Sequence, residues 1–555
     1  MNIRKSLVIL SLLALVAAGI FTIYRHYMAP TRILVVNALE AQQADFVLNN
    51  DSHHIEVTCM EADEMHDIDD FDAIIVYARR IFLSDGQMEE IEHAAGKGIP
   101  IFTKTLRSSD FVENRNLTAE QIATLQLYFD NDNRQNYRNG LRYLRHIATP
   151  HRWGDQEVDG PVEVPANMYY HREYGLYFKT ADELTAYLQE KGMYHQDGPR
   201  VAFISGISFP MEGNREHVDT LISMLTEKGM NVYPLTAMGK KRDNMLRSLK
   251  PDAVVFMAMG RIGNDTLVHW LNECNIPLFC PYPLSCSHDD WMNESMPMAS
   301  GSKNARIVIP EIDGGIVPFC IGTQNKDQKG FFKHTAEVER CQMFVDYVCR
   351  YLSLRTKPNK EKRIAIGYFK RPGKDALLAS GMEVIPSMYN FLLRLRQEGY
   401  DVSGLPESLE AFARQVKTEG LVLGSYAKGA QQEYMRKGHP VWLSKTEYEK
   451  WAKEVLAPEK YAEVTARYGE APGCLLAHGD SIAVACLRYG NVVLFPQPRP
   501  ALGDDDFKLV HEWKCHRHIV TWHLTCMYRK VSGPMRSSIS VHTETWSSPQ
   551  GATQA

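Results

Sequence analysis

Two carboxylates stand close together in the segment IPEIDGGIVPFCIGTQ, which covers residues 309–324. Glu311 and Asp313 are two positions apart, so on a β-strand their side chains would lie on the same face. A close carboxylate pair can hold a cation, or can take protons from ring nitrogens when a metal ion replaces them. The two glycines that follow allow a ligand or another strand to approach the backbone closely. The alternative interpretation is a solvated turn.

Two loops carry further charged candidates. The segment NVVLFPQPRPALGDDDFK, residues 491–508, runs from a predicted strand into a proline-rich loop that ends in three aspartates. The sequence PGKD at 372–375 follows another strand-like run but lacks the glycine spacing of a phosphate-binding loop. No GxGxxG pattern occurs either, so we predict no nucleotide site in this chain. The charged loop candidates are Lys374, Asp375, Arg499, Asp504 and Asp505, and rigid surface loops are the alternative interpretation.

Cysteine and histidine gather near the C-terminus in a pattern that offers zinc-type ligands. These residues are Cys515, His516, His518, His523 and Cys526. The eleven cysteines of the chain are otherwise irregularly spaced, and Cys274, Cys280 and Cys286 lie six apart, which does not suit CxxC zinc ligation. We expect buried small hydrophobic side chains, or an isolated disulfide.

Short apolar runs bounded by polar residues recur along the chain. Near-continuous β-branched runs between turns are typical of buried parallel strands. The predicted strands are Thr31–Asn37, 72–78, Pro199–Ser205, 252–258, Lys362–Tyr368 and 420–424. Amphipathic helices such as His217–Lys228 and Ser387–Glu398 lie between them. Alternating strands and helices favour an α/β fold made of several successive Rossmann-like parallel-sheet domains with helical insertions.

Composition divides this fold into segments. The 555 residues have ordinary globular composition and suffice for about three or four domains with cores of their own. The predicted segments are a transmembrane helix at 1–28, an α/β domain at 29–150, a helical linker or insert at 151–197, α/β domains at 198–356 and 357–513, and a tail at 514–555. The formal net charge of −5 offers no general basic surface for nucleic acid.

The N-terminus predicts a single-pass membrane anchor. Arg4 and Lys5 precede an uncharged apolar run, Leu7–Tyr24, which is close to the lower limit of about 18 residues for crossing a bilayer. No good cleavage site ends the run, which favours an uncleaved signal anchor over a cleaved signal. Positive charge before the helix favours a body outside the cytoplasm, in a periplasm where the cell has one, although two later arginines oppose this orientation.

Several of these segments, in this order, resemble the CobN/magnesium-chelatase H family, the large subunits of the tetrapyrrole metal chelatases. The family's Pro-Glu-hydrophobic-Asp-Gly pattern matches Pro310–Gly314. KRIAIGYFKRPGKD at 362–375 resembles the family's next α/β unit, and 491–511 resembles the strand and proline-rich loop before its catalytic half. Upstream, 198–235 resembles the first strand and helix of another domain, so the resemblance covers 198–511.

The resemblance implies that the chain binds a tetrapyrrole of the hydrogenobyrinate or haem type, with a divalent cobalt, iron or magnesium ion as second substrate. Cytoplasmic members of the family work with a pair of ATPase subunits, and a membrane-anchored HmuS-like branch runs the reaction backwards and removes iron from haem. Glu311, Asp313 and His511 are then the candidates for lining the tetrapyrrole or metal site. A cytoplasmic body favours ATP-driven cobalt insertion, and a body outside the cytoplasm favours iron removal. A non-catalytic, membrane-anchored tetrapyrrole-binding or metal-binding protein is the third hypothesis.

The resemblance stops after Trp513. Codons that permit VSGPMRSSISVHTETWSSPQ can be translated in the neighbouring frame as FGADAIIHFGTHGNLEFTP, which is very close to a hallmark of the family's catalytic half. We therefore interpret 514–555 as an out-of-frame, disordered tail whose cysteines and histidines are an accidental metal pattern. On this interpretation the chain lacks the catalytic half and has little or no chelatase activity by itself.

Overall fold

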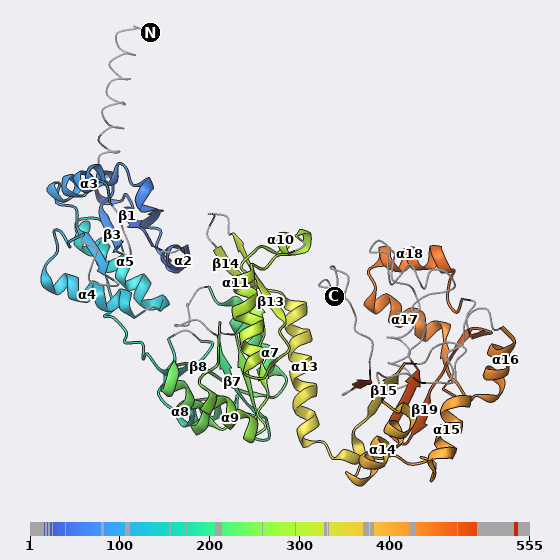
Figure 1. Cartoon of the computed structure of the whole chain (residues 1–555). Coiled ribbons are helices and arrows are strands. Elements are labelled where there is room, and N and C mark those ends of the chain that lie inside the picture. Colours follow the sequence, from blue (N-terminus) through green and yellow to red (C-terminus); the bar gives the residue numbers. More distant parts are fainter. Residues whose placement is uncertain are drawn as a thin grey trace, which may run out of the picture. The chain divides into compact units, whose positions relative to one another are not determined.

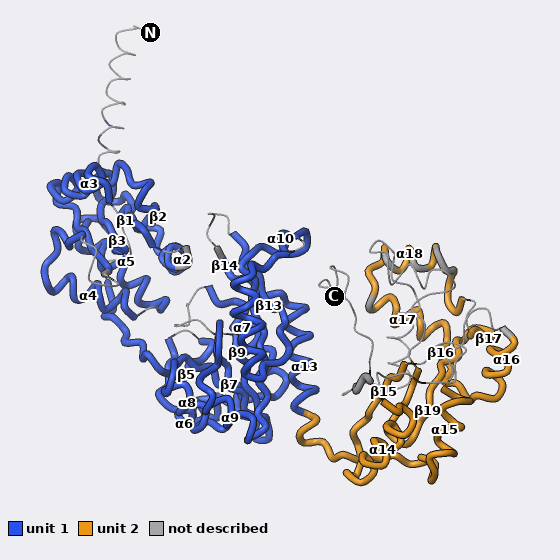
Figure 2. The backbone as a smooth tube through the Cα atoms, viewed as in Figure 1, with its two compact units in different colours: residues 1–352 blue, residues 353–555 orange. Residues whose placement is uncertain are grey.

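The computed structural model describes residues 26–496, apart from short gaps, together with 538–541 and isolated positions before 26. The gaps are at 39, 79–82, 106–111, 132, 155–156, 174, 206–213, 258, 295, 327–329, 331, 370–376, 378–381, 421–427 and 474–475. The chain divides into two compact units, Met1–Leu352 and Ser353–Ala555 (Figure 2). The predicted membrane anchor falls almost entirely outside the described residues, and none of the helices that are described is long and apolar enough to cross a membrane.

A four-stranded parallel sheet opens the first unit, in the strand order β2-β1-β3-β4 (Figure 1). Its strands are β1 (Thr31–Val36), β2 (Ile55–Met60), β3 (Ala73–Ala78) and β4 (Ile101–Thr105). Helices cover both faces: α2 (Glu40–Asn49), α4 (Ala119–Asp130) and α5 (Arg134–Ala148) on one, and α3 (Asp85–Gly96) on the other. Because both faces are covered, the strands are the near-continuous apolar runs that the sequence predicts.

One buried arginine holds the amino end of this sheet. Arg145, near the end of α5, has an exposed fraction of 0%. Its guanidinium donates to the hydroxyl of Thr31 at 2.6 Å and to the backbone carbonyls of His54, Trp153 and Gly154 at 2.9, 2.6 and 3.3 Å. A buried cation that is fully hydrogen-bonded in this way ties three separate chain segments together.

We expect Arg145→Met to lower the free energy of unfolding by about 3 kcal/mol, because four buried acceptors lose their donors. Arg142→Met is the matched control on the same helix, since the Arg142–Asp51 ion pair at 3.0 Å is largely solvated. Its loss should cost less than about 1 kcal/mol. Urea denaturation measures both values, and equal effects would contradict the structural role of Arg145.

The second sheet of the first unit has seven strands in the order β12-β10-β9-β7-β8-β5-β6. Five of them are parallel: β7 (Arg200–Ile204), β8 (Asn231–Thr236), β9 (Ala253–Phe256), β10 (Leu278–Phe279) and β12 (Gly315–Ile316). The chain builds outward from β7, first to β8 on one side and then to β9 on the other. The strand order therefore reverses between β7 and β9, which is where open α/β sheets bind ligands.

Helices again cover both faces of this sheet (Figure 1). Those on one face are α7 (Glu216–Glu227) and α13 (Val338–Thr356), and those on the other are α6 (Ala181–Glu190), α8 (Gly239–Leu249) and α9 (Asp265–Glu273). The predicted helix His217–Lys228 corresponds to α7. The α/β class with parallel sheets is thus confirmed.

The predicted linker at 151–197 differs from the structure. β5 (Met168–Tyr170) and β6 (Tyr177–Phe178) extend the second sheet, with β5 antiparallel to β8 and β6 antiparallel to β5. Their three and two residues are too short to show the apolar periodicity from which strands are predicted. Tertiary pairing with β8, not local sequence, makes them strands.

The second unit contains two smaller sheets, and its first one is built around β15 (Ile364–Tyr368). β15 lies parallel to both β20 (Val492–Pro496) and β21 (Ser538–Val541), and β19 (Leu487–Tyr489) is antiparallel to β20. The antiparallel second sheet joins β16 (Val441–Ser444), β18 (Ser481–Val484) and β17 (Ala477–His478). The helices are α14 (Val384–Gln397), α15 (Leu409–Thr418), α16 (Lys428–Lys437), α17 (Lys445–Val455) and α18 (Pro458–Tyr468).

Strand β21 corrects part of the prediction of a disordered tail at 514–555. Four of its residues, Ser538–Val541, pair with β15. The alternating SISV sequence suits a strand, and the otherwise unpaired edge of β15 accepts it. The predicted strand at 420–424 falls almost wholly within the gap at 421–427. All eight cysteines in the described part of the chain are free thiols, and four of them, Cys280, Cys320, Cys341 and Cys486, are buried as predicted, whereas Cys274 is exposed.

Candidate functional site

The Pro-Glu-Ile-Asp segment is helical, so it is neither the strand on which the two carboxylates would share a face nor a solvated turn. Residues 300–312 form one helical stretch made of α11 (Ser300–Lys303), the π-helical turn η3 (Asn304–Val308) and α12 (Ile309–Ile312). In the π-helical turn, the N–H of Ile309 donates to the carbonyl of Asn304, five residues earlier. The physical reason lies in Pro310, which has no N–H to donate to Arg306 as an α-helical turn requires. Such turns are frequent at functional sites.

Glu311 and Asp313 therefore do not share a face. Glu311 is exposed, whereas Asp313, just after the helix, is only 3% exposed. The Asp313 carboxylate accepts hydrogen bonds from Nε of Arg261 at 2.7 Å and from the backbone N–H of Ile262 at 2.8 Å. Asp313 thus fixes the connection from β9 to α9, and the expected shared-face carboxylate pair is not formed.

The two glycines after Asp313 allow a close approach of two strands. Gly314 has a φ of +84°, which favours glycine. A Cβ on Gly315 would lie 2.7 Å from both Sγ of Cys280 and the carbonyl oxygen of Pro310. Gly315 is paired with Leu278 of β10, so the close neighbour is another strand.

The other residues that the sequence singled out lie outside the described residues, and their roles stay predictions. These are Lys374, Asp375, Arg499, Asp504, Asp505, His511, Cys515, His516, His518, His523 and Cys526. Within the part of the chain that the structure describes, no three histidine, cysteine or acidic side chains are grouped closely enough to hold a metal ion.

The connection from β7 to α7 carries a buried imidazole. His217, in the first turn of α7, is 1% exposed, and its ring centroid lies 4.9 Å from that of His334. His334 belongs to β14 (Phe332–Ala336), which forms a small sheet with β11 (Tyr282–Pro283) and β13 (Cys320–Lys326). The side-chain oxygen of Asn214 accepts the backbone N–H of His334 at 2.6 Å and so ties β14 to the start of α7.

A glycine on β13 lets α7 come close to this small sheet. A Cβ on Gly322 would lie 3.1 Å from Cβ of His217 and 2.8 Å from the carbonyl oxygen of Thr335. Because no larger residue fits there without a shift, Gly322 keeps His217 packed beside β13 and β14.

Arg306 completes what we call the imidazole–guanidinium cluster, which consists of His217, His334 and Arg306. Arg306 lies in the π-helical turn and is half-buried, and burial lowers the pKa of its guanidinium. It makes no hydrogen bond or ion pair with any residue that the structure describes. The Nδ1 atoms of His217 and His334 are likewise buried and have no partner among the described residues.

The two imidazoles of the cluster are neutral at physiological pH. Burial, His334 and Arg306 together lower the pKa of His217 to about 3. Burial and the charge of Arg306 also lower the pKa of His334. The cluster therefore carries one positive charge, on Arg306, with neutral imidazole nitrogens beside it.

The connection after β9 positions Arg306. The N–H of Gly260 donates to the carbonyl of Ala305 at 2.7 Å, next to Arg306 in the chain. At the other end of the same helical stretch, Asp313 accepts from Arg261 and Ile262. The β9 connection thus holds the stretch at both ends. Sequence patterns missed the cluster because its three residues are single positions in three distant segments.

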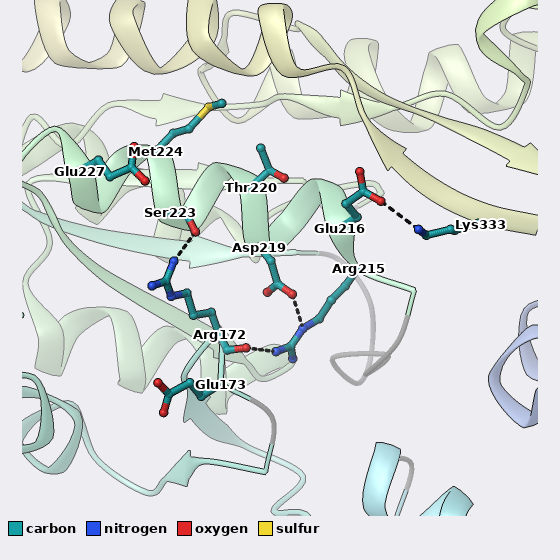
Figure 3. Close-up of a pocket in the computed structure, with 10 residues that line it drawn as sticks. All are labelled: Arg172, Glu173, Arg215, Glu216, Asp219, Thr220, Ser223, Met224, Glu227 and Lys333. Carbon is teal, nitrogen blue, oxygen red and sulfur yellow. Dashed lines mark hydrogen bonds and ion pairs between the residues drawn. The ribbon is translucent and has the colours of Figure 1, made fainter. Parts of the chain in front are cut away.

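A hollow of about 800 Å³ lies on the flank of α7 (Figure 3). Two of its cations are paired with acids of the same hollow: Arg215 contacts Asp219 at 3.1 Å, and Lys333 contacts Glu216 at 3.2 Å. Arg172 also reaches the flank and donates to the hydroxyl of Ser223 at 2.6 Å. The cations of this hollow therefore have partners within the protein. Arg306 of the imidazole–guanidinium cluster has no such partner among the described residues.

A family model for CobN/Magnesium Chelatase matches residues 126–531, which is more than half of the chain. The chain belongs to the CobN/magnesium chelatase family. The family predicted from the sequence motifs is thereby confirmed, whereas the anchored branch and the out-of-frame tail remain predictions.

Two relatives illustrate the match. The uncharacterized protein MJ0908 of Methanocaldococcus jannaschii is 24% identical over 445 residues, which cover 74% of this chain and 35% of that protein. The magnesium-chelatase subunit ChlH of Oryza sativa subsp. indica is 23% identical over 343 residues, which cover 58% of this chain and 23% of the relative. The chain thus spans about a third or less of the length of these curated relatives.

One solved structure has the same fold. The catalytic subunit of cobaltochelatase from Mycobacterium tuberculosis superposes with a TM-score of 0.70 and 19% sequence identity. The superposition covers 92% of this chain and 42% of that subunit. At this identity the likeness concerns the fold alone.

We expect Asp313→Ala to lower the free energy of unfolding by about 2 kcal/mol, because Nε of Arg261 and the buried N–H of Ile262 lose their acceptor, although Arg261 keeps its contact with Asp265. Glu311→Ala, two positions away and exposed, should change it by less than about 0.5 kcal/mol. Urea denaturation compares the two variants. A larger effect at Glu311 would contradict the helical geometry.

We also expect His217 to make the first unit less stable in acid. Its pKa is about 3 in the folded protein against 6.5 ordinarily, so below pH 6.5 the unfolded chain binds more protons. The stability associated with neutral His217 is complete above that pH and is lost as the pH falls toward 3, by about 2 kcal/mol at pH 5. Urea denaturation measures the free energy of unfolding of His217→Gln and of the wild type. As the pH falls from 7 to 5, the difference between them should shift by about 2 kcal/mol in favour of the variant.

The control for this pH dependence is His269→Gln, on α9, where the imidazole is 75% exposed. The change with pH should be larger for the His217→Gln difference than for the His269→Gln difference. A pH-independent difference for His217→Gln would show that His217 is not held neutral.

Proposed function

We propose that this chain forms the tetrapyrrole-binding α/β part of a metal chelatase large subunit and serves in metal insertion into the macrocycle. The observation that carries the proposal is the family match over 126–531, which spans most of both compact units. The fold shared with a cobaltochelatase catalytic subunit supports it. Cobalt and magnesium ions are the candidate metal substrates, and ATPase subunits are the candidate partners.

The chemistry of the cluster agrees with such a substrate. A tetrapyrrole is a flat apolar ring with acidic side chains, so its site needs apolar surface together with a few fixed cationic or hydrogen-bonding groups. The imidazole–guanidinium cluster supplies such groups at the start of α7 and next to the connection after β9, and the strand order of the sheet reverses between β7 and β9.

Iron removal from haem is the second candidate function. The observation that favours it is the apolar run Leu7–Tyr24 after Arg4 and Lys5, which is consistent with an anchored body outside the cytoplasm. Such a body would have no access to ATP. Protease accessibility in intact cells or spheroplasts discriminates the two candidates, because only an external body is cleaved.

We expect the purified chain to bind protoporphyrin or haem with a saturable shift of the Soret band at one equivalent. Circular dichroism establishes that the protein is folded in the same sample. Addition of Co²⁺ or Mg²⁺ to the porphyrin complex, and release of iron from the haem complex, then test for turnover, which we expect to be little or none for a chain without the catalytic half. If no macrocycle gives a saturable shift with folded protein, the proposed function is wrong.

A further inference from the structure

The cluster contains a cation that the protein itself does not neutralise. Burying a charged group is costly unless it is paired or hydrogen-bonded. Arg306 is half-buried and has no partner among the described residues. The two acids in the first turn of α7, Glu216 and Asp219, are paired with Lys333 and Arg215. An arginine placed in this way is typical of a site that binds an anionic group.

The neighbouring imidazoles can donate N–H hydrogen bonds, as the guanidinium of Arg306 does. A neutral imidazole carries one N–H, and its direction is set by the hydrogen bonds of the ring. His217 is almost fully buried, and neither its Nδ1 nor that of His334 has a partner among the described residues. Arg306 and Leu284 line the same cavity, and the N–H of Leu284 donates to the carbonyl of Gly322, which packs against His217. The guanidinium and the two imidazoles therefore belong to one region of the fold.

The start of α7 has the same electrostatic sign. His217 lies in the first turn of this 12-residue helix, whose N-cap residue, Arg215, makes no side-chain capping hydrogen bond. The amide groups of a first helical turn carry a partial positive charge that stabilises anions. Two acids of the same turn, Glu216 and Asp219, oppose this partial charge, so the case for a negative ligand rests on the guanidinium and the imidazoles.

A metal cation fits this cluster less well. Neutral imidazoles are good metal ligands, but the fixed charge of Arg306 repels a divalent cation at short range. The described residues also offer no third ligand near the two histidines. An oxyanion satisfies all three side chains, whereas a metal ion satisfies at most two of them.

A small apolar cavity adjoins the guanidinium. It measures about 140 Å³ and is lined by Arg306, by apolar residues such as Leu284 and Met298, and by the two serines Ser285 and Ser302. Apolar walls beside a cation suit a hydrocarbon arm that ends in a carboxylate, because the arm is desolvated while the charged end is paired.

We propose that His217, Arg306 and His334 bind a carboxylate side chain of the tetrapyrrole and so fix the orientation of the macrocycle. The proposal rests on the proposed function, because it takes a tetrapyrrole as the substrate. It adds a specificity determinant: macrocycles whose acidic side chains are free bind, and those whose side chains are esterified bind weakly.

The experiment is a Soret titration of the full-length chain with protoporphyrin and with its dimethyl ester. Wild type should bind the diacid about tenfold or more tightly than the diester, as expected for a charge-assisted hydrogen bond. Arg306→Met should lose about tenfold in affinity for the diacid and nothing for the diester. Arg306→Lys should lose less, because it keeps the charge but not the planar fork of donors.

The matched control is Arg247→Met, on α8, which covers the opposite face of the sheet and pairs with Asp243 at 2.5 Å. It should leave both affinities unchanged. His217→Gln tests the imidazole separately and should weaken only the diacid. Excess acetate should compete with the diacid and not with the diester, and competition by inorganic phosphate alone would identify a free-anion site in place of a substrate subsite.

The outcomes separate this proposal from the proposed function. If neither porphyrin binds to the folded wild type, the proposed function fails. If both porphyrins bind equally, or if Arg306→Met weakens both to the same extent while thermal melting shows a folded variant, the carboxylate subsite is wrong and tetrapyrrole binding stands.

Discussion

The buried carboxylate of Asp313 fixes the part of the first unit on which the candidate site depends. It accepts hydrogen bonds from the guanidinium of Arg261 and from the backbone N–H of Ile262, in the connection that follows β9. The same connection donates the N–H of Gly260 to Ala305, eight residues before Asp313. Two attachments on one helical stretch leave little freedom for Arg306, which lies between them. A cation whose position is fixed in advance recognises an anion without a further loss of side-chain entropy.

The electrostatics of the cluster follow from this placement. Arg306 lies where burial already disfavours charge, and its field helps to keep His217 and His334 neutral. Fully protonated histidines would add two more positive charges that no described acid neutralises. With neutral rings the cluster buries one positive charge beside hydrogen-bonding neighbours. The free-energy cost of burying charge in the folded state is therefore lower. An anion that binds there offsets the remaining cost, so folding stability and ligand binding are linked at this point.

Much of the fold was predictable from local sequence, because β1, β3, β7, β9 and β15 are β-branched runs that both faces of a sheet bury. The family motif around Asp313 was also visible, but its geometry was not. Whether Pro-Glu-Ile-Asp forms a strand or a helix depends on the π-helical turn before Pro310 and on the partner at Arg261, 52 residues away. His217, Arg306 and His334 carry no local pattern, since one histidine or arginine on an amphipathic element is ordinary. Only the tertiary structure brings them together.

Two arginines of the first unit show how burial distinguishes a structural cation from a binding one. Arg145, at the amino end of the first sheet, donates four hydrogen bonds to oxygens from three chain segments. Its donors are used, so it can only stabilise the fold. Arg306, on the helical stretch that is bonded to the connection after β9, has the same chemistry but no partner among the described residues. Since the carboxyl ends of parallel strands are where such sheets bind ligands, the difference in hydrogen bonding and the difference in position indicate the same role for Arg306.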